Sequence, residues 1–147
     1  MGMRSRSESK GRWSMSVDNR TVVDDTLDLM IRYCNDVAYI RHQIGTIENL
    51  YDSITYQYAL AGAVQQIGEC TRQIDIWLEN HYDYNWSKVI GMRNILSHRY
   101  HKLDKELLWK VSENSVPEVL GIVLDLKEKA ALYPDEDFLN IGSKRSD

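Results

Sequence analysis

The segment from residue 86 to residue 101 carries side chains that can bind a phosphate group and transfer a proton. It reads W-S-K-V-I-G-M-R-N-I-L-S-H-R-Y-H, and its candidate polar side chains are Arg93, Asn94, His98 and Tyr100. On one continuous helix, at about 100° per residue, Asn94, His98 and His101 fall within about 60° of one another. Arg93 and Tyr100 then form a second row about 100° to one side. The spacing predicts one helix with a reactive polar face.

The other side of this predicted helix is apolar. Its residues are Val89, Met92, Ile95, Leu96 and Leu103. A helix of this kind packs by its apolar face and presents its polar face outward. We therefore expect a cation, an amide, an imidazole and a phenol to be accessible together.

These groups fit the metal-free cleavage of an RNA phosphodiester, in which the 2′-hydroxyl attacks the adjacent phosphorus. The reaction needs a base for the hydroxyl, an acid for the leaving 5′-oxygen and positive charge at the phosphorus. His98 can act as base or acid, because an unperturbed histidine titrates near pH 6.5. Arg93 offers planar, permanently charged donors to the phosphate. Asn94 can orient the imidazole or donate to a phosphate oxygen, and Tyr100 can contact RNA or stack on a base.

Apolar periodicity along the rest of the chain predicts the helices that hold this segment. Apolar residues recur mostly at three- and four-residue steps over residues 23–44 and 56–77. Capping residues predict helix starts at Asp18 or Asn19, at Asp52 or Ser53, at Asn85 and at Asp104. Ser115–Pro117 predicts a break before a last helix that ends near Leu132. No strand alternation, glycine-rich phosphate loop or repeat is visible, so we predict an all-α, compact antiparallel bundle of about five helices.

Length and composition favour one domain. The chain has 147 residues, of which 43% are hydrophobic and 27% charged, enough to build a core. We predict a disordered basic tail at residues 1–16, a helical domain at 17–134 and a weakly ordered tail at 135–147. The net charge of −4 argues against a general nucleic-acid coat protein, whereas five Lys or Arg residues between Gly91 and Val111 favour a local surface for RNA.

The cysteines and the hydropathy pattern predict a cytoplasmic protein. Cys34 and Cys70 fit no metal-ligand spacing and lie among apolar helical residues, so we expect buried free thiols. No apolar run approaches the roughly 20 residues that span a bilayer. No apolar stretch follows the basic N-terminal residues, so we expect neither a signal peptide nor a membrane partner.

The reactive segment resembles the signature of HEPN-domain toxins of the HepT type. The run G-M-R-N-x-L-x-H-x-Y occupies residues 91–100, with Trp86 before it. Ile67-Gly68-Glu69 matches an I-G-E element typical of the family's second helix, and Asp104 followed by Trp109 matches its D-x-x-x-x-W. Pro117 falls where a late proline is common. The resemblance covers roughly residues 22–132.

The resemblance implies a HEPN-like bundle that pairs as a homodimer and acts as a metal-independent endoribonuclease toxin. Its R-x(4)-H motif, here Arg93 and His98 with Asn94, lies near the dimer cleft in such proteins. Two facing copies of His98 would supply the acid and the base that one imidazole cannot supply in a single step. The resemblance further implies a minimal nucleotidyltransferase antitoxin that modifies Tyr100, which would place negative phosphate where RNA binds. The expected product is a 2′,3′-cyclic phosphate.

Several alternatives remain open from the sequence. A HEPN domain can also be a non-catalytic binding module that partners a nucleotidyltransferase. Arg99 and His101 lie outside the family motif and are at most auxiliary RNA contacts. Glu69 either orients Arg93 across the bundle or is an ordinary exposed carboxylate.

We expect neither a metal nor a cofactor. No pair of acids in the motif segment has metal-ligand spacing. Asp24, Asp25 and Asp28 lie at a predicted helix start, where the helix dipole already accounts for acidic residues.

Overall fold

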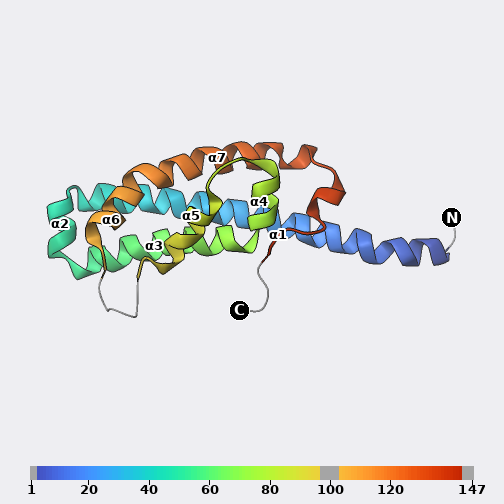
Figure 1. Ribbon diagram of the computed structural model, residues 1–147, viewed down its shortest axis with the longest axis horizontal. Coiled ribbons are helices and arrows are strands. Elements are labelled where there is room, and N and C mark those ends of the chain that lie inside the picture. Colours follow the sequence, from blue (N-terminus) through green and yellow to red (C-terminus); the bar gives the residue numbers. More distant parts are fainter. Residues whose placement is uncertain (1–2, 97–102, 144–147) are drawn as a thin grey trace.

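All regular structure in the described part of the chain is helical. The computed structural model describes residues 3–96 and 103–143, with side chains from residue 18 onward (Figure 1). Its α-helices are α1 (Met3–Ile44), α2 (Ile47–Asp52), α3 (Ile54–Gln73), α4 (Asp75–His81), α5 (Trp86–Gly91), α6 (Lys105–Lys110) and α7 (Val116–Lys129). Shorter turns are η1 (Met92–Asn94), η2 (Val111–Ser115), η3 (Ala130–Leu132) and η4 (Asp135–Phe138). The predicted all-α bundle is confirmed. None of the described helices is long and apolar enough to cross a bilayer.

Helix α1 forms the middle of the bundle and packs against α3 on one side and α7 on the other (Figure 1). Its buried residues follow the predicted three- and four-residue steps: Val23, Leu27, Met30, Cys34 and Val37. Matching stripes on the neighbouring helices include Leu60, Val64 and Ile67 on α3 and Val119, Val123 and Leu126 on α7. Removing these apolar faces from water drives the three long helices together.

Both cysteines are free and buried, as predicted. Burial raises the pKa of the Cys34 thiol to about 12 and that of the Cys70 thiol to about 11, because the thiolate would lose its hydration. Both thiols therefore stay protonated at neutral pH and are poor nucleophiles. Their contribution is to packing.

Three of the predicted helix starts are confirmed by capping hydrogen bonds. The Ser53 hydroxyl accepts from the backbone N–H of Tyr56 at 3.1 Å, and the Asp104 carboxylate accepts from that of Leu107 at 3.0 Å. The Asn85 side-chain oxygen accepts from the backbone N–H of Lys88 at 3.2 Å. Each cap satisfies a donor that the first helical turn leaves without a partner.

The start predicted for the first helix is wrong. Helix α1 begins at Met3 and runs through Asp18 and Asn19. Asn19 therefore lies inside the helix, and its side-chain amide donates to the carbonyl oxygen of Phe138 at 2.6 Å, far away in the sequence. No proline precedes residue 117, so no residue type forces a later start. The disordered tail expected at residues 1–16 stays a prediction.

The break predicted at Ser115–Pro117 is also absent. Helices α6 and α7 are joined by η2, a π-helical turn, so helical backbone continues from residue 105 to residue 129. Pro117 lies in the first turn of α7, where the missing N–H is tolerated. The π turn keeps Val111, Ser112 and Ser115 buried while the chain passes the proline.

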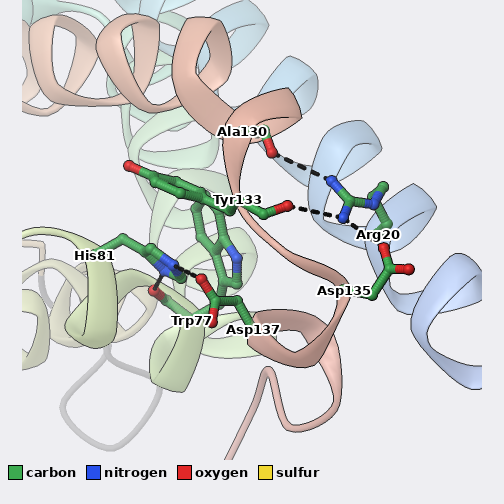
Figure 2. Close-up of polar contacts among 7 residues, drawn as sticks. All are labelled: Arg20, Trp77, His81, Ala130, Tyr133, Asp135 and Asp137. Carbon is green, nitrogen blue, oxygen red and sulfur yellow. Dashed lines mark hydrogen bonds and ion pairs between the residues drawn. The ribbon is translucent and has the colours of Figure 1, made fainter.

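The C-terminal segment contacts the bundle as far as residue 143, where the backbone N–H of Ser143 donates to the Asp75 carboxylate at 2.8 Å; the domain boundary at residue 134 stays a prediction. Arg20 of α1 donates to the carbonyl oxygens of Ala130 and Tyr133 at 3.2 and 3.0 Å and to the carboxylate of Asp135 at 2.7 Å (Figure 2). Its guanidinium also lies 4.1 Å from the ring centroid of Phe138. Arg20 thus links the turns after α7 to the central helix α1. The linked residues are more than 100 positions apart in the sequence, so no local pattern predicts the contact.

His81 at the end of α4 fastens the same segment. Its Nδ1 lies 2.8 Å from the carbonyl oxygen of Trp77, and its Nε2 lies 3.1 Å from a carboxylate oxygen of Asp137 (Figure 2). The imidazole stacks on Tyr133 with 4.2 Å between ring centroids. His81 therefore has a structural role in this fold.

Phe138→Ala tests whether the C-terminal segment belongs to the core. Phe138 is fully buried, so we expect the free energy of unfolding to fall by about 3–5 kcal/mol. Leu132→Ala is the matched control: Leu132 is 82% exposed, and its truncation should change stability by less than about 0.5 kcal/mol. Urea unfolding followed by circular dichroism measures both. Equal midpoints for the two variants would show that the segment is not part of the cooperative unit.

Candidate functional site

The structure places Arg93 and Asn94 together in η1, directly after α5. Arg93 is half-buried and Asn94 is exposed. His98, Arg99, Tyr100 and His101 lie outside the described residues. The described half of the candidate site is therefore a guanidinium and an amide on neighbouring residues of one short turn.

The single helix predicted for residues 86–101 is wrong. Helix α5 ends at Gly91, η1 follows, and Ile95 and Leu96 are bends. The N–H of Ile95 donates to the carbonyl oxygen of Met92 at 3.1 Å, a tighter pattern than the α-helical one. The spacing of about 100° per residue that was assumed for the rows of side chains therefore does not hold through η1, where Arg93 and Asn94 lie.

The predicted packing side is nevertheless confirmed. Val89 and Met92 are buried, while Ile95, Leu96 and Leu103 are half-buried against the same core. These residues fix the turn to the bundle. They leave the polar residues of η1 at the surface.

Trp86 anchors the start of α5. It is 1% exposed, its indole N–H donates to the carbonyl oxygen of Tyr82 at 3.0 Å, and Tyr84 contacts its ring edge-on. A large side chain buried at one end of a two-turn helix fixes the position of that helix against α3. Through α5 it also limits where η1 can lie.

Gly68 of α3 lets two backbones meet directly beneath Arg93. An added Cβ at Gly68 would lie 2.6 Å from the backbone nitrogen of Arg93 and 3.0 and 3.1 Å from the carbonyl oxygens of Val89 and Ile90. Real Cβ contacts are longer, so only glycine permits this approach. The backbone position of Arg93 is consequently set by α3.

Glu69, the next residue of α3, forms an ion pair with Arg93. Its Oε2 lies 3.8 Å from the Arg93 Nε, and its Oε1 accepts from an Arg72 amino group at 3.3 Å. Of the two readings the sequence allowed for Glu69, the structure favours the one in which it meets Arg93 across the bundle. Arg72 was missed; its place one turn after Glu69 on a predicted helix was the available signal.

The acidic cluster on α1 is separate from this site. Asp24, Asp25 and Asp28 are exposed, with carboxylate oxygens within 4.8 Å of one another. The Lys127 ammonium lies 2.5 Å from Asp24 and 3.0 Å from Asp28. A cation from α7 therefore already pairs with two of these three carboxylates.

Gly68→Ala tests the close contact between α3 and η1. We expect the free energy of unfolding to fall by about 1–3 kcal/mol, because the backbone of Arg93 must move to admit the methyl group. Gly62→Ala on the same helix is the matched control: an added Cβ there meets nothing within 4 Å, so stability should rise by about 0.5–1 kcal/mol. Thermal and urea unfolding give both values. A neutral Gly68→Ala would show that α3 does not fix η1.

Comparison with known proteins shows to which family a chain with this geometry belongs. The family model "Ribonuclease HepT-like" matches residues 30–126, which include Gly68, Glu69 and Arg93. The chain is 32% identical over 91 residues to "Putative RNase MJ1380" of Methanocaldococcus jannaschii. The aligned region covers 61% of this chain and 83% of that protein. It is also 30% identical over 66 residues to "Probable ribonuclease HepT" of Thermococcus cleftensis. That aligned region covers 44% of this chain and 60% of the relative. No solved structure matches the chain significantly. The chain belongs to the HepT-like ribonuclease family.

Proposed function

We propose that this protein is a metal-independent endoribonuclease, the toxin of a toxin–antitoxin pair, with Arg93 and His98 as its catalytic residues. The observation that carries the proposal is the half-exposed guanidinium of Arg93, fixed to α3 inside the matched family segment and followed after four residues by His98. The names of the relatives support RNA as the substrate class.

In the proposed reaction the 2′-oxygen of RNA forms a bond to the adjacent phosphorus, and the bond from phosphorus to the 5′-oxygen breaks. A neutral imidazole accepts the proton of the 2′-hydroxyl, and an imidazolium gives a proton to the leaving 5′-oxygen. The products are a 2′,3′-cyclic phosphate and a 5′-hydroxyl. Because one imidazole cannot be both base and acid in a single step, the proposal includes a homodimer that contributes two copies of His98.

Arg93 supplies positive charge to the phosphate as negative charge builds up on its oxygens. A guanidinium stays charged at every relevant pH and can donate two parallel hydrogen bonds to phosphate oxygens. Asn94, exposed on the same turn, donates its amide to RNA or orients His98. Both residues are attached to rigid helices, which lowers the cost of bringing them to the transition state.

Tyr100 is the proposed control point. A nucleotidyltransferase antitoxin would transfer a nucleoside monophosphate to the phenol oxygen and release pyrophosphate from the nucleoside triphosphate. The new phosphodiester adds negative charge two residues after His98. That charge would repel RNA and compete for the guanidinium of Arg93.

Cleavage of labelled RNA in EDTA tests the proposed activity. We expect wild-type protein to cut, and we expect His98→Ala to lower kcat by at least about 100-fold, because proton transfer is lost. His42→Ala, on an exposed residue of α1, is the matched control and should cut like wild type. Mass spectrometry of the fragments should show 2′,3′-cyclic phosphate ends. Free 3′-hydroxyl ends, or full activity of His98→Ala, would contradict the mechanism.

The same experiment separates the enzyme from a non-catalytic HEPN module that only partners a nucleotidyltransferase. Growth arrest when the protein is expressed alone, relieved by Arg93→Ala, would favour the enzyme. No cleavage by wild-type protein whose intact mass shows an unmodified Tyr100 would favour the binding module.

Tyr100→Phe tests the proposed control point. With a cognate minimal nucleotidyltransferase and a nucleoside triphosphate, wild-type protein should gain the mass of one nucleoside monophosphate and lose RNA cleavage. Tyr100→Phe should gain no mass and keep cutting, because it lacks the acceptor oxygen. Tyr58→Phe, at a tyrosine that is 60% exposed on α3, is the control and should behave like wild type. Modification of Tyr100→Phe would place the acceptor elsewhere.

A further inference from the structure

The carboxylate of Glu69 lies between two arginines that come from different elements. Its Oε1 accepts from an amino group of Arg72, one turn later on α3, at 3.3 Å. Its Oε2 lies 3.8 Å from the Nε of Arg93 on η1. Among the described residues, no other carboxylate lies within 4 Å of the Arg93 guanidinium.

Arg72 is placed to hold Glu69 rather than to bind a ligand. Its side chain is 20% exposed, the least of the three, and its Nε is buried without a partner among the described residues. The side chain therefore has little freedom to turn outward. Its paired amino group fixes one oxygen of Glu69, and the other oxygen is left facing Arg93.

The contact with Glu69 can orient the Arg93 side chain without using the hydrogen-bond donors of its guanidinium. A separation of 3.8 Å exceeds the length of a hydrogen bond, so the carboxylate attracts the guanidinium by charge. The contact is on the Nε side, and among the described residues no partner is found for the two terminal amino groups of the guanidinium, which can therefore face a phosphate. The Arg93 side chain is 31% exposed, so solvent and RNA can reach it.

The backbone reinforces this arrangement. Glu69 follows Gly68, whose missing side chain brings α3 against the backbone nitrogen of Arg93. The same contact therefore fixes the start of the Arg93 side chain and places the carboxylate beside its far end. Such support around a reactive group keeps it close to its productive geometry.

We propose that Glu69 is a positioning residue for Arg93 and that Arg72 in turn holds Glu69. The inference rests on the proposed ribonuclease function, because the role of Arg93 does. It adds a specific consequence: Glu69 raises the rate of the chemical step although its negative charge opposes the binding of RNA.

Glu69→Gln tests this inference, because loss of the Glu69 charge and loss of its positioning of Arg93 have opposite effects on RNA cleavage: the first favours substrate binding (KM), and the second slows the chemical step (kcat). Removing a negative charge beside an RNA site should leave KM unchanged or lower it by up to about 3-fold. Losing the carboxylate that aims Arg93 should lower kcat by about 10-fold. Glu79→Gln is the matched control, since Glu79 is exposed on α4 and pairs with no described residue, and it should keep the wild-type kcat. Circular dichroism confirms that each variant is folded.

A double-mutant cycle shows whether Glu69 acts through Arg93. In the Arg93→Ala background, Glu69→Gln should lower kcat by less than about 2-fold, because no guanidinium remains to be positioned. Arg72→Gln should lower kcat in the wild-type background in the same direction as Glu69→Gln. An equal loss with and without Arg93 would overturn the inference, because Glu69 would then act independently.

The outcomes also separate this inference from the proposed function. If wild-type protein cuts RNA, Arg93→Ala cuts it with a much lower but measurable kcat and Glu69→Gln keeps the wild-type kcat, then only the positioning role is overturned. If wild-type protein with an unmodified Tyr100 cuts no RNA, the proposed function fails, and the positioning role fails with it. A lower melting temperature with an unchanged kcat would mean that Glu69 merely stabilises the fold.

Discussion

The close approach of α3 to α5 and η1 at Gly68 is the constraint on which the candidate site depends. Two helical backbones meet there with no side chain between them: Glu69 follows Gly68 on α3, and Arg93 itself supplies the backbone nitrogen on η1. Because backbone contacts of this kind cannot slide without a collision, the relative position of Glu69 and Arg93 is set by the fold. The buried side chains of Trp86, Val89 and Met92 pack α5 and η1 into the core beside this contact.

The ion pair between Glu69 and Arg93 matters more for orientation than for stability. Both side chains are about one third exposed, and a pair with that exposure contributes less than about 1 kcal/mol after solvent screening. The core supplies the stability instead, through the buried faces of α1, α3 and α7. The charged pair of the site therefore contributes little to the stability of the fold.

Local signals predicted much of the fold, and contacts between distant residues account for the rest. The caps at Ser53, Asn85 and Asp104 act within one turn, so the sequence alone located them. The path of the C-terminal turns depends on Arg20 and Asn19, more than 100 residues away. For the candidate site, residue types and spacing pointed to Arg93 and left the role of Glu69 open, while the spacing of Arg72 one turn after Glu69 was a signal that went unused.

A single chain buries its large core side chains by itself but supplies only one catalytic histidine, His98, to the proposed reaction. Trp77, Trp86 and Phe138 are fully or almost fully buried within one chain. The proposed proton transfers, in contrast, require a second copy of the chain, since one copy of His98 cannot be base and acid in the same step. The specific activity of the protein should therefore rise with protein concentration as dimers form. That relation follows from the chemistry of one imidazole per chain and is independent of which RNA is cut.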